Sequence, residues 1–223
     1  MNTMKLSCAS LILLTTLATT ASFAAGVETN VADSKGKPLT NAVVYFVPTQ
    51  PVTNAKPKHV VIDQVDKEFV PRVTVVQTGT AIDFPNKDDI RHQVYSFSSA
   101  KTFQLNLYSG RPSAPIVFDK PGVVVLGCNI HDHMVAWVLS VDTPWFAQTD
   151  AKGRAQMSDL PVGKYEMLVW YPGLAQPVSQ GQVDSSSPVQ RSIQLETGAL
   201  LGVNTDGQDH GQEHDHGSHA SGS

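Results

Sequence analysis

The chain has 223 residues, and its 16 Lys and Arg against 20 Asp and Glu give a formal net charge of −4. It carries no basic block of the kind that binds nucleic acid, so we expect no nucleic-acid partner. The length suits one large domain or two small ones, and 14 prolines, 16 glycines and many Val and Thr runs favour β structure.

Residues 1–24 have the features of a secretory signal peptide. Lys5 supplies the positive start, Leu11–Leu17 lies in an apolar core, and Ser22-Phe23-Ala24 is a small-x-small cleavage site. The apolar part is too short to span a bilayer. Cys8 precedes this core instead of closing it, so a lipoprotein anchor is not expected. We predict a periplasmic protein, cleaved near Ala24 and without a stable membrane anchor.

Strand and turn signals then alternate along the chain. Val27–Phe46 predicts a first hairpin around the turn Asp33–Leu39, and the proline-rich residues 48–58 predict a linker. Phe69–Val75 alternates apolar with polar or small residues, as a half-buried strand does. Further apolar runs lie at 60–62, 81–84, 92–97, 103–107, 115–118, 123–126 and 135–141. No segment has the periodicity of an amphipathic helix, so the pattern predicts an all-β sandwich or barrel.

A loop between the last two of these runs holds Cys128, His131 and Met134 within seven residues. Thiolate, imidazole and thioether form a soft ligand set that suits copper cycling between two oxidation states. A mononuclear site needs one further imidazole, for which His92 is the candidate. Alternatively, Cys128 is a small buried apolar residue and the histidines are surface groups. His133 could also ligate in place of Met134, or it could face solvent, since neighbouring side chains of an extended segment point to opposite sides.

Signal-peptide cleavage would remove Cys8 and leave Cys128 as the only cysteine. In an oxidising compartment a single thiol cannot form an internal disulfide. It must therefore be buried, paired with another chain or bound to metal.

The order of these residues resembles that of the cupredoxins and is similar to the plastocyanin and pseudoazurin layout. The likeness is closest to bacterial cupredoxin-like proteins of the methylamine utilisation type, which have a loop similar to Gly127–Met134. The matching pattern runs Phe69-x-Pro71-x-Val73-x-Val75, Gly79, Ile82-x-Phe84-x-Asn86, His92, Pro121-Gly122 and Cys128-x-x-His131. The resemblance implies a Greek-key sandwich and outer-sphere electron transfer.

The same resemblance implies one type 1 copper, held by His92, Cys128 and His131 with Met134 as a weak axial ligand. Met134 lies closer to His131 than in plastocyanin-like loops. That spacing is similar to the dinuclear copper centre of terminal oxidases, which needs a second cysteine. A mononuclear site is therefore expected. Asn86 could pin the ligand loop or be an ordinary turn residue, and we expect Phe84, Val94 and Ile130 to exclude water.

Past Val141 the chain resembles the carboxypeptidase-regulatory or transthyretin-like sandwich. The residues that carry this likeness are Thr149–Gly153, Leu160–Tyr165 and Met167–Gly173, together with Asp33–Val43. The resemblance implies a second, small β-sandwich made of residues 26–50 and 143–200, with a cupredoxin domain, 51–142, inserted between them. The alternative is that the first hairpin adds to the cupredoxin sheet.

Residues 201–223 form a polar tail with few apolar side chains, which we expect to be disordered. His210, His214, His216 and His219 lie in it among Gly, Ser, Asp and Glu. Tracts of this kind bind Cu, Zn or Ni loosely, so accessory metal binding is one interpretation and a solubilising role is the other.

The sequence contains no G-x-S-x-G, H-E-x-x-H or phosphate-loop motif, so we expect no enzymatic activity. The leading hypothesis is a periplasmic electron carrier whose redox partner protein is not identified by the sequence. The alternative is a copper-handling or resistance protein that stores or buffers copper with help from its tail. A third class is an adhesion or scaffold module built on the second sandwich.

Overall fold

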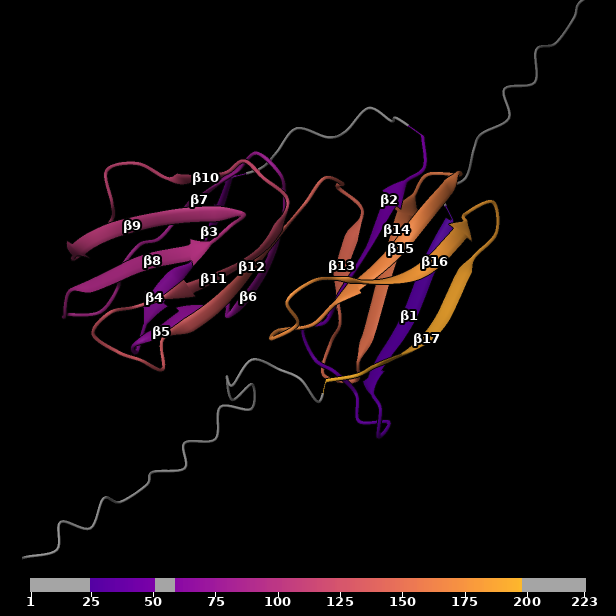
Figure 1. Ribbon diagram of the computed structural model, residues 1–223, viewed down its shortest axis with the longest axis horizontal. Helices are drawn as coiled ribbons and strands as arrows, with labels where there is room; N and C mark the ends of the chain where they lie inside the picture. Colours follow the sequence, from indigo (N-terminus) through magenta and orange to yellow (C-terminus); the bar gives the residue numbers. More distant parts are fainter. Residues whose placement is uncertain (1–24, 51–58, 198–223) are drawn as a thin grey trace, which may run out of the picture.

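The computed structural model describes residues 25–50 and 59–197, and all regular structure in these ranges is β-strand (Figure 1). This confirms the predicted all-β fold of packed sheets. Among these residues, no helix is long and apolar enough to cross a bilayer. The predicted signal peptide, most of the linker and the His-rich tail lie outside the described residues.

One group of strands comes from both ends of the described chain, and we call it the flanking unit. It forms a three-stranded sheet in the order β14-β1-β17 and a four-stranded sheet in the order β13-β2-β15-β16. A hydrophobic core that includes Val31, Phe46, Leu160 and Ile193 lies between them. Its strands are β1 (Ala25–Asp33), β2 (Val43–Pro48), β13 (Phe146–Gln148), β14 (Arg154–Leu160), β15 (Lys164–Trp170), β16 (Val178–Asp184) and β17 (Val189–Leu195).

The predicted first hairpin is wrong, because β1 and β2 lie in different sheets of the flanking unit. β1 pairs with β14 and β17, whereas β2 pairs with β13 and β15. The intervening turn has the expected polar contacts, since Oδ1 of Asp33 accepts the N–H groups of Lys35 (2.9 Å) and Lys37 (2.8 Å). Beyond it the chain buries Leu39 and turns again at Asn41, where φ is 63°. The chain therefore crosses from one sheet to the other.

The remaining strands form the central unit, residues 59–141. A three-stranded sheet, β10-β7-β3, and a five-stranded sheet, β6-β12-β11-β8-β9, enclose a core that includes Ile62, Phe84, Phe118 and Val138. β4 and β5 form a separate hairpin. The strands are β3 (His59–Val61), β4 (Asp63–Val65), β5 (Glu68–Val70), β6 (Val73–Gln77), β7 (Thr80–Asp83), β8 (His92–Ser98), β9 (Lys101–Tyr108), β10 (Ile116–Phe118), β11 (Gly122–Gly127) and β12 (Val135–Val141).

The single strand predicted for Phe69–Val75 is two strands. β5 pairs with β4, whereas β6 runs parallel to β12. Pro71 lies between them and is exposed. Proline has no N–H to donate to a strand partner, so it interrupts the ladder at this point. Phe69 and Val73 are both buried as expected, but in different cores of the molecule.

The two units share a third hydrophobic cluster. Trp137 and Leu139 of β12 pack there against Tyr45 and Trp170 of the flanking unit. The opposite side of β12 contributes Ala136 and Val138 to the core of the central unit. β12 is thus buried on both faces, and Figure 1 shows it, with β6, on the side of the central unit nearest β13 and β2.

Candidate metal centre

Two neighbouring strands bring the predicted ligands together. His92 is the first residue of β8, while Cys128 and His131 lie in the loop between β11 and β12. β11 pairs with β12 along its whole length, and its last residue, Gly127, lies opposite Tyr95 of β8. The end of β11 and the start of β8 therefore meet at one end of the five-stranded sheet.

His92, Cys128 and His131 converge at this end of the sheet. One ligand atom from each residue lies within 4.8 Å of the other two. Sγ of Cys128 is 3.8 Å from Nδ1 of His92, and the ring centroids of His92 and His131 are 5.1 Å apart. His92 is 0% exposed and Cys128 is 3% exposed, whereas His131 is half-buried. Within the described ranges this is the one such group of His, Cys, Asp or Glu side chains.

The group fits a transition-metal ion in its chemistry. Nδ1 of His131 is buried and has no hydrogen-bond partner. An unpaired buried nitrogen is costly, and coordination of an ion would satisfy it. Desolvation lowers the pKa of His131 below its usual value, and the charges of His92, Lys67 and His133 act in the same direction. The neutral imidazole binds metals, and one thiolate with two imidazoles points to copper.

Sequence reasoning missed Asp88, which contacts the far side of the His92 ring. Oδ2 of Asp88 is 2.7 Å from Nε2 of His92. Desolvation raises the pKa of Asp88, but hydrogen bonds from Lys67, His92 and Asp66 outweigh it and hold the pKa below its usual value. Asp88 is therefore ionised at neutral pH and can only accept hydrogen bonds. Its position four residues before His92, in the polar run Asn86-Lys87-Asp88-Asp89, was the available signal.

Two other predicted residues, Met134 and His133, flank the group in the ligand loop. Met134 is buried in the core of the central unit, and its N–H donates to the carbonyl of His131 (3.0 Å). His133 is exposed, with its ring centroid 5.8 Å from that of His131. The axial role of Met134 and the alternative role of His133 stay predictions. His210, His214, His216 and His219 lie outside the described residues.

Asn86 is buried and organises the loop before His92 instead of the Cys128 loop. Its Nδ2 donates to the carbonyls of Ile90 (2.8 Å) and Tyr108 (2.9 Å), and its Oδ1 accepts the N–H of Asp88 (3.0 Å). Asn86 is thus tied to the segment that carries Asp88.

The surroundings of Cys128 differ from expectation at one residue. Phe84 and Val94 are buried, but Ile130 is 47% exposed, so its predicted part in excluding water is wrong. Tyr95 covers the backbone before Cys128 instead, because a Cβ on Gly127 would come within 2.7 Å of the Tyr95 ring. A glycine next to a candidate ligand can mark such a close approach.

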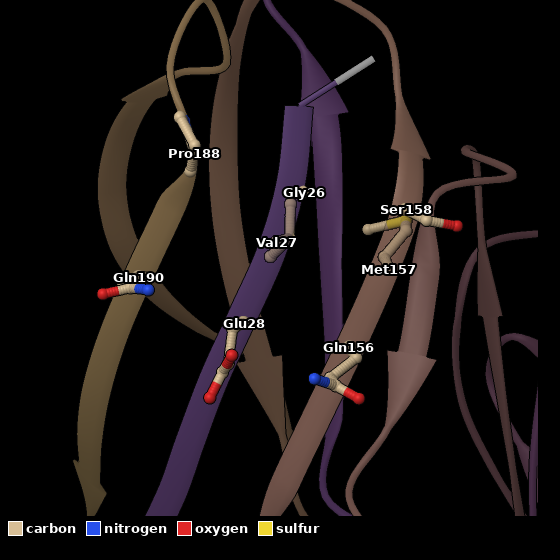
Figure 2. A pocket seen from close by; sticks show the side chains of 8 residues that line it. All are labelled: Gly26, Val27, Glu28, Gln156, Met157, Ser158, Pro188 and Gln190. Carbon is tan, nitrogen blue, oxygen red and sulfur yellow. The ribbon is translucent and has the colours of Figure 1, made fainter.

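A groove also lies on the flanking unit, along β1, β14 and β17 (Figure 2). Figure 2 shows Glu28, Gln156 and Gln190 on these three neighbouring strands. The lining contains one carboxylate and no thiol or imidazole, so the groove does not offer the ligand types of the His92, Cys128 and His131 cluster. The lining residues are Gly26, Val27, Glu28, Gln156, Met157, Ser158, Pro188 and Gln190.

No protein-family model and no curated protein matches the chain. Solved structures of copper proteins and cupredoxins are similar to part of it, and three of them illustrate the likeness. The Cu-containing nitrite reductase from Thermus scotoductus SA-01 is 25% identical over 41% of this chain and 25% of its own, with a TM-score of 0.36. A purple cupredoxin from Nitrosopumilus maritimus is 19% identical over 37% of this chain and 99% of its own, with a TM-score of 0.33.

The third structure is a pseudoazurin from Methylobacterium extorquens AM1. It is 23% identical over 38% of this chain and 76% of its own, with a TM-score of 0.33. The matched part of this chain spans a quarter of the length of the nitrite reductase. The resemblances to methylamine utilisation proteins and to the transthyretin-like sandwich stay predictions.

Proposed function

We propose that this chain is a periplasmic cupredoxin that binds one type 1 copper ion and carries electrons by outer-sphere transfer. The observation that carries the proposal is the convergence of Cys128, His92 and His131, whose ligand atoms lie within 4.8 Å of one another at one end of a β-sheet. His92 and Cys128 are 36 residues apart in sequence, so the fold itself must hold them together.

The side chains are suited to electron transfer because the fold holds two of them in buried positions. His92 and Cys128 are buried, and Nε2 of the His92 ring is hydrogen-bonded to the Asp88 carboxylate. Rigid, dry surroundings limit the rearrangement that a change of charge demands. A bound copper ion would supply one-electron redox chemistry between its two oxidation states. In this proposal Met134 would be the fourth, weakly bound ligand.

We propose a carrier and not an enzyme. A set of two imidazoles, one thiolate and one axial thioether would surround the ion with protein atoms and leave no position for a substrate. His131 is half-buried, whereas His92 is buried, so the His131 side of the site is the route by which a redox partner protein would exchange electrons.

Loading the mature chain with Cu(II) tests this function. We expect one equivalent of copper per chain, an intense visible absorption band from the thiolate, and a reversible one-electron couple in voltammetry. The same protein loaded with Zn(II) is the control, because a d10 ion gives no such band. A Cu(II)-loaded chain without colour would contradict the proposal.

The His-rich tail favours a second candidate, a copper-handling protein. Copper stoichiometry of the full chain and of a variant that ends at residue 204 separates the two functions. If the chain is a carrier, we expect removal of residues 205–223 to leave the visible band and the couple unchanged. Several tail-dependent copper ions and no reversible couple would favour copper storage or buffering instead.

A further inference from the structure

The Asp88 carboxylate accepts three hydrogen bonds beside the candidate metal centre. Oδ2 accepts from Nε2 of His92 (2.7 Å) and from the N–H of Lys67 (2.9 Å). Oδ1 accepts from the N–H of Asp66 (2.7 Å). The side chain is 13% exposed, so solvent screens this charge only in part.

The donors to Asp88 come from an unusual turn. Asp66 and Lys67 connect β4 to β5, and both have positive φ angles, 53° and 61°. Consecutive residues of this conformation can direct their N–H groups to one side, where they form a cradle for an anion. The backbone N–H of Asp88 donates in turn to Oδ1 of the buried Asn86 (3.0 Å). Hydrogen bonds therefore hold both the carboxylate and the backbone of Asp88.

The contact with His92 fixes which nitrogen of the ring carries a proton. A carboxylate can only accept, so the proton lies on Nε2. Nδ1 then keeps its lone pair, and Nδ1 is the nitrogen that lies 3.8 Å from Sγ of Cys128. The carboxylate thus acts on the ligand nitrogen through the ring.

We propose that Asp88 is a positioning residue that sets both the metal affinity and the reduction potential of the centre. It holds His92 as the Nε2–H tautomer with Nδ1 turned towards Cys128, which favours binding of an ion. Its negative charge, one imidazole away from the ion, favours the higher oxidation state and lowers the potential. This inference rests on the proposed copper function.

A purely structural role for Asp88 would be to attach the β4–β5 turn to the loop before His92. Losing that attachment would lower the stability of the fold without acting on the redox couple. The reduction potential and the metal affinity therefore distinguish a positioning role from a structural one. The substitution must also keep the shape of the side chain, and Asp88→Asn does so while it removes the charge.

The test compares copper-loaded Asp88→Asn with copper-loaded Asp89→Asn in the full chain. Asp89 is the next residue and is exposed. Each substitution removes one carboxylate, so the two variants have the same net charge. We expect Asp88→Asn to favour the reduced state at least tenfold, which is a rise of about 59 mV for one electron. We also expect its Cu(II) affinity to fall roughly 10- to 100-fold. Asp89→Asn should leave both quantities near those of the unsubstituted chain.

Equal shifts in the two variants, or no shift in Asp88→Asn, would overturn the inference while leaving the copper function intact. Absence of a thiolate band in the unsubstituted chain would instead refute the proposed function. In that case nitrogen NMR of the metal-free, unsubstituted chain still tests the positioning role. We expect His92 to be protonated on Nε2 alone, and a proton on Nδ1 would exclude the role of Asp88.

Discussion

Replacing Cys128 with serine is expected to abolish the visible absorption band of the copper-loaded protein. The band requires a thiolate bound to the ion, and a serine hydroxyl stays protonated at neutral pH and is a harder donor. Cys128 is buried and its sulfur lies 3.8 Å from Nδ1 of His92, so the thiol is already beside another ligand. Serine is close to cysteine in size, and we expect the fold to persist. Absorption and electron-spin-resonance spectra of the two proteins measure the difference.

His133→Ala is the matched control for Cys128→Ser, because His133 lies in the same loop and is exposed. If His133 faces solvent, as the proposed ligand set requires, this variant keeps the band. A band that survives in Cys128→Ser would contradict the whole ligand assignment. A band that is lost in His133→Ala would move the fourth ligand from Met134 to His133.

Truncation of Trp170 to alanine is expected to reduce the free energy of unfolding by about 3–5 kcal/mol. Trp170 is 0% exposed, and its ring lies in the hydrophobic cluster that the two units share. Its Nε1 also donates to the carbonyl of Leu174 (2.8 Å), which the variant would leave without this partner. Denaturant unfolding of the metal-free protein measures the loss.

Phe97→Ala serves as the control for Trp170→Ala. Phe97 is another aromatic residue on a strand, but it is 75% exposed, so its truncation should change the free energy of unfolding by no more than about 0.5 kcal/mol. Losses of equal size in the two variants would show that the shared cluster contributes little. Two separate unfolding transitions in Trp170→Ala would show that the units unfold independently once the cluster is weakened.

Much of the central unit could be predicted from the sequence because its strands follow local patterns. The apolar run 135–141 coincides with β12, and the run 123–126 lies inside β11. The two pairing errors arose where local signals are ambiguous. The turn chemistry at Asp33 is the same whether the next strand pairs with β1 or crosses to another sheet. Alternation through Pro71 looks continuous until the missing N–H of proline is considered.

The candidate site was predictable to different degrees. Cys128 and His131 stand out because they share a short loop, and their residue types carry the information. His92 required the pattern of a whole family, since its proximity to Cys128 depends on β8 lying beside β11. Asp88 could not be assigned, because its role depends on a tight turn 21 residues earlier in the chain that presents two N–H groups to it.

Because β12 is buried on both faces, its register with the neighbouring strands is fixed from two sides. Shifting this strand by one residue would move Trp137 into the space that holds Val138, so neither side can accept a slip. Met134, at the end of the ligand loop, directly precedes β12. Its position therefore depends on the packing of β12 against the flanking unit, which supplies none of the candidate ligands. We therefore expect substitutions in the flanking unit that disturb the packing of β12 to affect the candidate ligand loop as well.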